Sequence, residues 1–356
     1  MAPLRILTSS DVDSILTTLS PQTALASQAS VFTSFSQTSS SSPSSDIPSI
    51  QTPHRITIAS EGTTTLFMPS RAPTSTTENT TACKIVAVPN GGGGEGLPAS
   101  TIIMDESSGR VKALINARKL TALRNAAGSA LFLSLFPTPQ PPTHLLVFGT
   151  GAQALAHATL FLRLHPSIMN LTFIIRSSTP RASSLLSHLQ SSFPQINIAL
   201  SVHSDASSSG LNELVNQADI IVTTTSSTSP LFNSTSTSPK KGTRVILIGS
   251  YKPTMHEVDT ALIKRSGIVV DSREACAREA GELIDAQLKE RDMVELGEVL
   301  SETEAMKKRV LEKSGGEEGV IVFKSVGLGI QDVSIARLVL DEAEQRGIGT
   351  IIDDYD

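Results

Sequence analysis

The chain has 356 residues, with 29 lysines and arginines against 34 aspartates and glutamates, which gives a formal net charge of −5. This length predicts about two domains, and a mildly acidic chain without a basic run argues against a nucleic-acid partner. No apolar stretch approaches the roughly 20 residues that cross a bilayer, the first residues do not resemble a secretory signal, and two cysteines are too few for a disulfide scaffold or a cysteine metal site. We therefore expect a cytoplasmic protein with no membrane partner and no metal.

The region up to about residue 140 has an irregular composition. Serine, threonine and proline dominate 36–53 and recur at 70–82, and a glycine run follows at 91–94. Such segments bury little apolar surface, so they predict surface insertions between short strands. Clusters of β-branched and apolar residues predict those strands at 54–59, 64–68, 84–88, 100–105 and 111–115. Gly109 supplies a hairpin turn, and a helix is predicted over 120–136.

From residue 144 onward, short apolar strands alternate with segments of helical length. This pattern predicts a parallel sheet that is covered on both faces. The expected strands are 144–148, 171–175, 196–202, 219–224, 244–249, 267–270 and 319–323. Helices are expected at 152–164, 180–193 and 329–346, with a charged helical region at 280–313 and an exposed loop at 226–240.

A glycine-rich turn follows the first of these strands. Gly149 permits a tight turn, Gly151 lets the backbone approach a pyrophosphate, and Ala154 allows close helix packing. The helix that begins at Ala152 offers free N–H groups and a positive dipole end to the phosphates. The pattern therefore indicates a dinucleotide site, with a simple strand–helix turn as the alternative.

The end of the second strand bears on which dinucleotide is bound. A site for NAD normally has an acidic residue here, which accepts hydrogen bonds from the ribose hydroxyls. This chain has Arg176 and Ser177 instead, with Arg181 close behind. A guanidinium and hydroxyls suit a 2′-phosphate, so the sequence favours NADP(H) over NAD(H). The alternative is that Arg176 is a solvated loop charge.

Three basic residues of the first region stand among apolar or small neighbours: Arg55, Lys84 and Arg124. A charge that is buried in such surroundings needs a partner, and a substrate carboxylate would serve. Each of them could equally be a surface or rim charge. Their positions in the sequence do not bring them together.

The motifs resemble those of the ornithine cyclodeaminase/mu-crystallin family, in the same order over most of the chain. The matching positions are Arg55, 68–69, 84–86, Gly109, Ala113, 120–130, 149–154, 249–253, Glu257, Asp259, 270–272, 279–282 and 323–332. The resemblance implies an α/β enzyme whose Rossmann-type doubly wound parallel sheet, over 136–323, binds NAD(P). It also implies a smaller α+β domain for substrate binding and dimerisation, formed by both chain ends (1–135 and 324–356), and hence a homodimer.

The resemblance also implies roles for individual residues. Arg55, Lys84 and Arg124 would hold the carboxylate of an α-amino or α-imino acid, with Arg124 also near the nicotinamide and Val326 beside the substrate. The residues implied to touch the cofactor are Ser100, Ala152, Gln153, Thr225 and Ser325. Asp332 fits either a role near the nicotinamide or a helix cap.

Two departures from the family pattern indicate the type of reaction. Cyclodeaminases carry an aspartate where this chain has Tyr251, and a glutamate just before the Met-Pro pair where it has Leu66. Without these carboxylates, deprotonating an ammonium and holding a second amine are difficult. Reducing a C=N bond that already exists requires only hydride placement, a carboxylate clamp and one proton. Ketimine reductases of the mu-crystallin type also lack that aspartate.

The leading hypothesis is NAD(P)H-dependent reduction of a small cyclic imino acid in proline metabolism. The reactions would be Δ1-pyrroline-2-carboxylate to L-proline and Δ1-piperideine-2-carboxylate to L-pipecolate. Lys84 is the first candidate proton donor, with Tyr251 or water as alternatives, and Leu66, Met68 and Val326 would line an apolar pocket for the ring. The other hypotheses are ornithine cyclodeamination, which converts L-ornithine to L-proline and ammonia, and a mu-crystallin-like protein that binds NADP(H) or another ligand without turnover.

Overall fold

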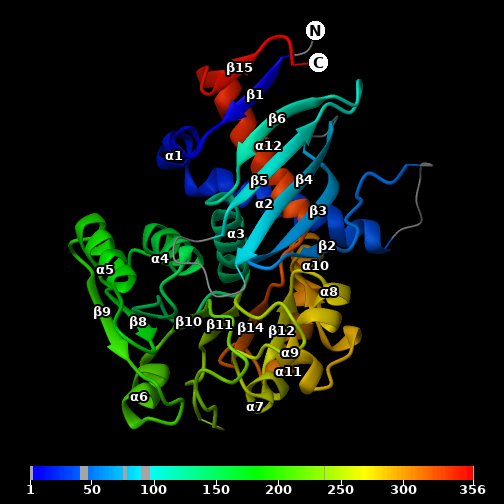
Figure 1. Ribbon diagram of the computed structural model, residues 1–356. Helices are drawn as coiled ribbons and strands as arrows, with labels where there is room; N and C mark the ends of the chain where they lie inside the picture. Colours follow the sequence, from blue (N-terminus) through cyan, green and yellow to red (C-terminus); the bar gives the residue numbers. More distant parts are fainter. Residues whose placement is uncertain (1–2, 41–46, 75–77, 90–96, 236, 356) are drawn as a thin grey trace. The chain divides into compact units, whose positions relative to one another are not determined.

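The computed structural model describes residues 3–40, 47–74, 78–89, 97–235 and 237–355. Two compact units divide the chain, one formed by Met1–Arg124 with Leu328–Asp356 and one by Asn125–Gly327 (Figure 1). The sequence predicts boundaries after residues 135 and 323, whereas the structure divides within helix α3 (Leu120–Leu135) and after strand β14 (Ile321–Lys324). The first turn of α3 is therefore grouped with the first unit. The functional roles of the two units stay predictions.

The first unit is built on a seven-stranded sheet with the order β15-β1-β6-β5-β4-β3-β2. Strands β1 and β6 are parallel, and the other neighbouring pairs are antiparallel. The strands are β1 (Leu4–Leu7), β2 (Ile56–Ala59), β3 (Thr63–Pro73), β4 (Asn79–Pro89), β5 (Ala99–Met104), β6 (Val111–Asn116) and β15 (Thr350–Ile352). The helices are α1 (Ser9–Thr18), α2 (Pro21–Ser40), the first turn of α3 and α12 (Gly329–Arg346).

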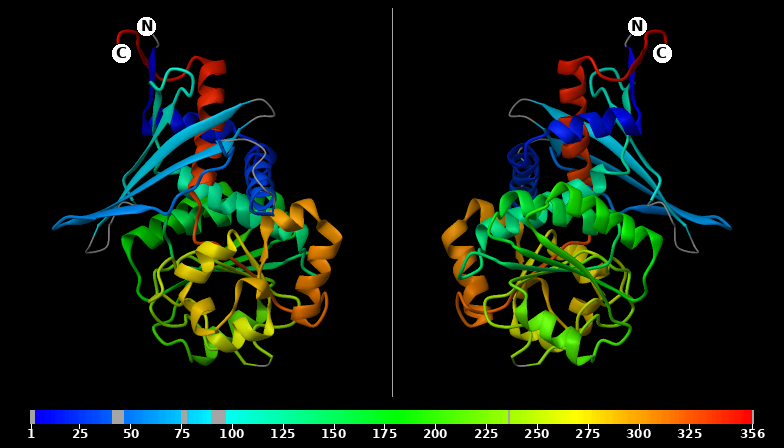
Figure 2. Two further views of the ribbon diagram at one scale, coloured as in Figure 1. Left: turned by 90° about the vertical axis from the view of Figure 1, so that its right-hand side faces the viewer. Right: turned by 90° about the vertical axis from the view of Figure 1, so that its left-hand side faces the viewer.

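Helix α12 packs along one face of this sheet, against β3, β4 and α2 (Figure 2). Its first residue, Gly329, lies so close to β3 that a Cβ atom would be 2.1 Å from Ser70 Oγ. Alternate residues of β4 point to the helix side and are buried, among them Ala82, Lys84 and Val86. This packing brings the start of α12 next to the middle of β4, where Lys84 lies.

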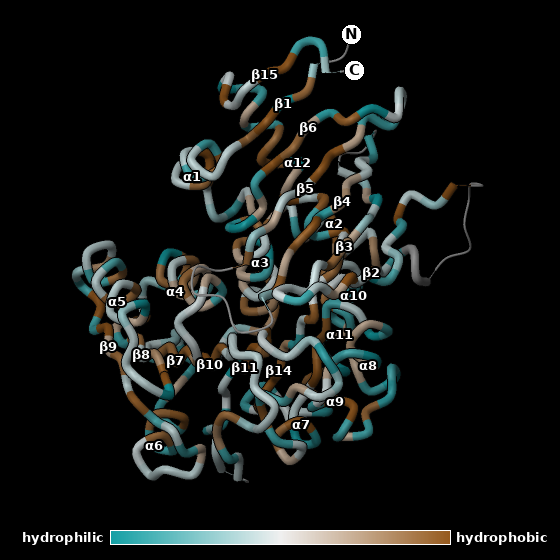
Figure 3. The backbone as a smooth tube through the Cα atoms, in the orientation of Figure 1, coloured by the Kyte–Doolittle hydropathy of each residue, from teal (hydrophilic) through white to brown (hydrophobic). Residues whose placement is uncertain are grey.

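The second unit is an eight-stranded parallel sheet with the order β13-β12-β14-β11-β10-β7-β8-β9. Helices lie on both faces (Figure 2), and the strands are largely hydrophobic along their length (Figure 3). From β7 the chain builds β8 and β9 on one side and then crosses to β10 on the other side. The switch point of this doubly wound sheet therefore lies between β7 and β10.

The remaining elements of the second unit are as follows. The strands are β7 (His144–Phe148), β8 (Asn170–Ile175), β9 (Asn197–Val202), β10 (Ile220–Thr223), β11 (Arg244–Leu247), β12 (Gly267–Val270), β13 (Val294–Glu295) and β14. The helices are α4 (Ala152–Leu164), α5 (Pro180–Ser192), α6 (Ser209–Gln217), α7 (Thr260–Arg265), α8 (Arg273–Glu279), α9 (Gly281–Asp285), η1 (Glu290–Asp292), α10 (Leu296–Ser301) and α11 (Thr303–Ser314). The α/β prediction, with a Rossmann-type parallel sheet and a smaller α+β unit formed by both chain ends, is confirmed.

Several local predictions for the first unit are wrong. The described residues of the segment 70–82 do not form a surface insertion, because β3 and β4 continue as one long antiparallel pair as far as Pro73 and Asn79. Its many threonines are β-branched and suit a strand. The sequence does not predict helices α1 and α2. Their many serines and threonines hide the helical spacing of the buried apolar residues, such as Val31 and Phe32 in α2. The glycine run at 91–94 lies outside the described residues.

In the second unit, the region 280–313 is helical only in part, since η1 and β13 interrupt it. The segment 226–240 contains no helix or strand among its described residues, but it is anchored by the buried side chains of Phe232 and Ser238 rather than fully exposed. In the part of the chain that the structure describes, no helix is both long enough and apolar enough to cross a membrane.

Candidate functional site

Most of the residues predicted to bind the cofactor lie at one edge of the parallel sheet. Each follows the carboxyl end of a strand, and the five strands concerned, β14-β11-β10-β7-β8, are neighbours. Ligands of such sheets bind outside the carboxyl ends of the strands near the switch point. The predicted cofactor residues at this edge are Gly149, Gly151, Ala152 and Gln153 after β7, Arg176 and Ser177 after β8, Thr225 after β10 and Ser325 after β14. The same edge carries Tyr251 after β11, a predicted proton donor, and Val326 after β14, predicted to lie beside the substrate.

The glycine turn after β7 has the shape that a dinucleotide pyrophosphate needs. Gly149 has a φ of +104°, and a Cβ there would lie 2.7 Å from Thr224 Oγ1. Gly151 is the extended N-cap of α4 and, among the described residues, no side chain caps this helix end. The Arg181 guanidinium lies over the turn, 3.1 Å from a Cβ placed on Gly151. Backbone N–H groups at a helix N-terminus beside a guanidinium suit a phosphate anion.

Thr225 adds a polar group on the other side of the switch point. Its methyl group would lie 3.2 Å from a Cβ on Gly149, so the two residues are neighbours. Its hydroxyl oxygen is buried and has no hydrogen-bond partner among the described residues. Because buried polar groups normally have partners, this hydroxyl is suited to contact a ligand. The residues at this edge therefore fit a dinucleotide.

The predicted 2′-phosphate contacts lie at the end of β8. Arg176 is exposed, and its Nη2 donates a hydrogen bond to Ser227 Oγ at 3.1 Å. Ser177 is exposed beside it. A solvent-accessible guanidinium held by a hydroxyl can receive a phosphate without first breaking an ion pair.

Gly149→Ala is expected to weaken NADPH binding at least about tenfold, because the new Cβ must displace Thr224 and adopt an unfavourable φ. Gly109→Ala is the matched control: Gly109 has a φ of +72° but open space around it. Both variants should lose some stability, but only Gly149→Ala should lose affinity in a fluorescence titration. Equal NADPH affinity in the two variants would contradict a role for this turn in binding.

In the first unit, the structure brings together two of the three basic residues predicted to hold a carboxylate. Lys84 Nζ lies 2.7 Å from Asp332 Oδ2, and Arg124 Nε donates to Asp332 Oδ1 at 3.0 Å. Arg124 Nη1 also donates to Gln331 Oε1 at 2.6 Å. Lys84 and Arg124 are each only 3% exposed. The carboxylate of Asp332 therefore bridges two buried cations.

The positive charges of this cluster act on the pKa of Lys84. Burial lowers the pKa of Lys84 to about 8, and the positive charges of Arg124 and Arg55 act in the same direction, while Asp332 opposes them. Arg55 is half-buried just before β2, and its positive charge contributes to the lowered pKa of Lys84. Several positive charges thus lie close together around Asp332, and a buried group of cations favours an anionic ligand.

On the sheet, Lys84 has the hydroxyl residue Thr101 as its neighbour on β5 and apolar neighbours on β3. Met68 pairs directly with Lys84 across β3 and β4, and Leu66 pairs with Val86 on the same face. Ser100 pairs with Ile85 and therefore lies on the opposite face from Lys84, so its cofactor role stays a prediction. Val326 packs in the core of the second unit and is 7% exposed.

Sequence reasoning missed several residues of these clusters. The two roles that the sequence suggests for Asp332 do not include bridging Lys84 and Arg124, the sequence gives Gln331 no role, and it places Arg181 near the 2′-phosphate rather than over the glycine turn. Asp332 and Gln331 follow Gly329 in the first turn of α12. Both residues therefore belong to the family motif at 323–332, which could have pointed to them. A carboxylate in a largely apolar segment implies a buried cation as its partner.

A parallel sheet with a glycine turn at its switch point defines a Rossmann-type dinucleotide-binding fold. The chain belongs to the ornithine cyclodeaminase/mu-crystallin family, which it matches over residues 16–347. It is 30% identical to a Delta(1)-pyrroline-2-carboxylate reductase of Bacillus thuringiensis over 305 residues, which cover 83% of this chain and 86% of that protein. It is 29% identical to the ketimine reductase mu-crystallin of Mus musculus over 75% of this chain and 77% of that one.

Other relatives carry different names. An uncharacterized cyclodeaminase of Dictyostelium discoideum is 32% identical over 71% of this chain and 72% of its own length. Among solved structures, the Delta(1)-pyrroline-2-carboxylate reductase of Thermococcus litoralis, in complex with NADH and L-proline, superposes with a TM-score of 0.77 at 21% identity, covering 98% of this chain and 100% of that one. An archaeal alanine dehydrogenase dimer with bound NAD gives 0.78, also at 21% identity, over 99% and 100%. These structures support the fold.

Proposed function

We propose that the protein is an NADPH-dependent reductase of cyclic ketimine carboxylates, with Δ1-pyrroline-2-carboxylate and Δ1-piperideine-2-carboxylate as substrates. The observation that carries the proposal is the cluster of Lys84, Arg124 and Asp332, in which two buried cations share one carboxylate. The guanidinium and ammonium groups suit a substrate carboxylate, and Leu66 and Met68 beside them suit a methylene ring. The relatives named as ketimine and pyrroline-carboxylate reductases support the same reaction.

The first unit would bind the substrate and supply the proton. Arg124 and Arg55 bind the carboxylate, and the ammonium of Lys84 donates a proton to the ring nitrogen while the ring carbon of the C=N bond receives a hydride. When bound, the dinucleotide supplies that hydride. The C=N double bond becomes a C–N single bond, and the product is a cyclic amino acid. Asp332 keeps Lys84 charged and fixes its position before the substrate enters.

The second unit would hold the dinucleotide. The turn from Gly149 to Gln153 binds the pyrophosphate together with Arg181, while Thr225 and Ser325 contact the nicotinamide half. Tyr251 is half-buried, with Lys252 Nζ 5.6 Å from its ring centre. It replaces the aspartate of cyclodeaminases and is the second candidate proton donor.

The test is an absorbance assay of NADPH oxidation with each ketimine, run in parallel with NADH. Rapid turnover that yields L-proline or L-pipecolate supports the proposal. Release of ammonia from L-ornithine without added ketimine would instead support a cyclodeaminase, against which the absence of carboxylates at Leu66 and Tyr251 argues. Tight NADPH binding with no turnover of either ketimine would leave a binding protein and overturn the proposed reaction.

The proposed preference for NADPH depends on Arg176. Arg176→Met is expected to raise the KM for NADPH about 10–100-fold, because a charge-assisted hydrogen bond to the 2′-phosphate is lost, and to leave the KM for NADH nearly unchanged. Arg163→Met removes an exposed arginine near the end of α4 and serves as the control. Steady-state kinetics with both cofactors check the prediction. An equal effect of Arg176→Met on the KM values for the two cofactors would show that Arg176 does not bind the 2′-phosphate.

We further propose a homodimer in the cytoplasm. On the face of the seven-stranded sheet opposite α12, Phe67, Ile85 and Ile102 form an apolar patch. At its edge, Ile56 and Ile58 are 60% and 58% exposed. An exposed apolar patch of this kind suits contact with a second copy of the chain. Cys83 and Cys276 are free thiols, which suits a reducing compartment.

A further inference from the structure

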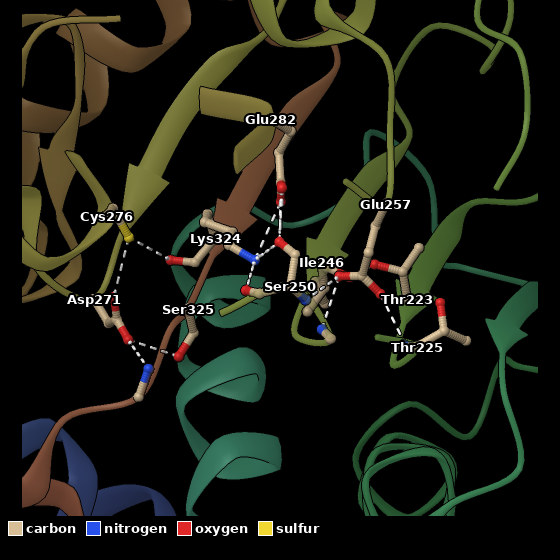
Figure 4. A network of polar contacts seen from close by, with 12 residues as sticks. Thr223, Thr225, Ile246, Ser250, Glu257, Asp271, Cys276, Glu282, Lys324 and Ser325 are labelled. Carbon is tan, nitrogen blue, oxygen red and sulfur yellow. Dashed lines mark hydrogen bonds and ion pairs between the residues drawn. The ribbon is translucent and has the colours of Figure 1, made fainter. Parts of the chain in front are cut away.

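A network of buried charged residues ties together the carboxyl ends of neighbouring strands in the second unit (Figure 4). Glu257, Glu282 and Lys324 are each fully buried, and the proposed reaction assigns a role to none of them. Lys324 ends β14, Glu257 lies between β11 and α7, and Glu282 lies in α9. Burying three charges is unfavourable unless each has close partners.

Glu257 connects the segment after β10 with the segment after β11. Its Oε1 accepts a hydrogen bond from the backbone N–H of Thr225 at 2.9 Å. Its Oε2 accepts from the N–H groups of Gly249 and Ser250 at 2.7 and 3.1 Å. Gly249 fits so closely that a Cβ there would lie 2.1 Å from Thr225 O and 2.5 Å from Glu257 Oε1. One carboxylate therefore sets the spacing of these two segments.

Lys324 and Glu282 also bind the segment after β11, through Ser250. Lys324 Nζ donates to Ser250 O and Ser250 Oγ, both at 2.6 Å, and lies 3.1 Å from Glu282 Oε1. The Ser250 hydroxyl also lies 2.7 and 2.6 Å from the two oxygens of Glu282. Ser250 is thus bound through its N–H, its carbonyl and its hydroxyl, and Tyr251 follows it directly.

The surroundings of Glu257 move its pKa into the neutral range. Burial raises the pKa of Glu257 to about 7, and Glu282 acts in the same direction, whereas Lys324 and hydrogen bonds from Thr225 and Thr223 oppose the rise. Near Lys324, the buried thiol of Cys276 lies 3.4 Å from Asp271 Oδ1. His256, which precedes Glu257 in the sequence, pairs with Asp285. Lys324 forms its ion pair with Glu282, and its positive charge also lowers the pKa of Glu257.

We infer that Glu257 is a positioning residue for dinucleotide binding: its carboxylate holds Thr225 and the 249–251 segment at the spacing that the bound cofactor requires. The inference rests on the proposed function in that it places the dinucleotide at this edge of the sheet. Thr225 carries the buried hydroxyl that has no partner among the described residues, and its backbone position is set by Glu257. Lys324 and Glu282 hold the opposite side of the 249–251 segment.

The test compares Glu257→Gln with Glu298→Gln. Glutamine keeps the shape of Glu257 but presents an NH₂ group to at least one of the backbone N–H donors, so NADPH affinity should fall about tenfold or more. Glu298 pairs with Arg273 away from these segments, so its substitution should leave NADPH affinity unchanged. The chain contains no tryptophan, so NADPH fluorescence reports binding directly, and a melting curve checks the fold. Wild-type affinity in a folded Glu257→Gln protein would overturn the inference.

A second measurement needs no substitution. Ionised Glu257 accepts three N–H groups, so the affinity of the wild-type protein for NADPH should fall as the pH is lowered through about 7. This change should be missing in Glu257→Gln, while the 2′-phosphate, which titrates at about pH 6, affects both proteins alike. Binding that is unchanged across this pH range overturns the inference alone. Absence of NADPH and NADH binding at every pH overturns the proposed function as well.

Discussion

Lys84→Met is expected to lower kcat/KM for a ketimine carboxylate about 10²–10⁴-fold, the range for loss of a positioned proton donor, while NADPH affinity stays near that of the wild type. Methionine fills much of the same volume, and Asp332 keeps Arg124 as its partner, so the fold should survive. The residues proposed to bind the dinucleotide belong to the other unit. Steady-state kinetics and an NADPH titration measure the two effects separately.

The control for this substitution is Lys112→Met. Lys112 lies on β6 in a partly exposed ion pair with Glu344, so its loss should leave kcat/KM unchanged. The pH profile provides an independent check. Lys84 must be protonated both to donate a proton and to attract the carboxylate, and its pKa is about 8. The wild-type kcat/KM should therefore fall as the pH rises through about 8. Near wild-type turnover by Lys84→Met would remove Lys84 from the mechanism.

The sequence predicts the second unit better than the first for a physical reason. Its strands are buried on both faces, so they appear as apolar runs such as those of β10 and β12. The long strands β3 and β4 are buried on one face only and carry several threonines. The sequence therefore predicts only 64–68 and 84–88 as strands, and the pairing of β3 with β4 shows that both strands are longer.

In the candidate site, too, one part could be predicted from the sequence and another could not. The glycine turn is local, so Gly149 and Gly151 could be predicted from their spacing within one strand–turn–helix segment. The bridge between Lys84 and Arg124 depends on Asp332, which lies more than 200 residues away from both in the sequence. Neither composition nor periodicity contains that contact. It arises because Gly329 lets the start of α12 approach β3 closely.

Asp332→Asn is expected to lower the free energy of unfolding by about 3–5 kcal/mol, the range for removing one partner of a buried ion pair. Lys84 and Arg124 would then lie buried without the carboxylate that joins them. Asp341→Asn is the matched control in the same helix, because the ion pair of Asp341 with Arg337 is partly exposed and its loss should cost less than about 1 kcal/mol. Urea unfolding followed by circular dichroism compares the two variants.

The dependence of this defect on pH separates loss of charge pairing from loss of shape. Asp332 raises the pKa of Lys84, against burial that lowers it, so Asp332→Asn should lower that pKa further. Where Lys84 is neutral in the folded protein but still protonated in the unfolded chain, stability rises with pH, and this rise should begin at lower pH in the variant. The defect relative to the wild type should thus be smaller at about pH 10 than at about pH 7. A defect of the same size at both pH values would mean that Asp332 contributes through packing and hydrogen bonds rather than by neutralising Lys84.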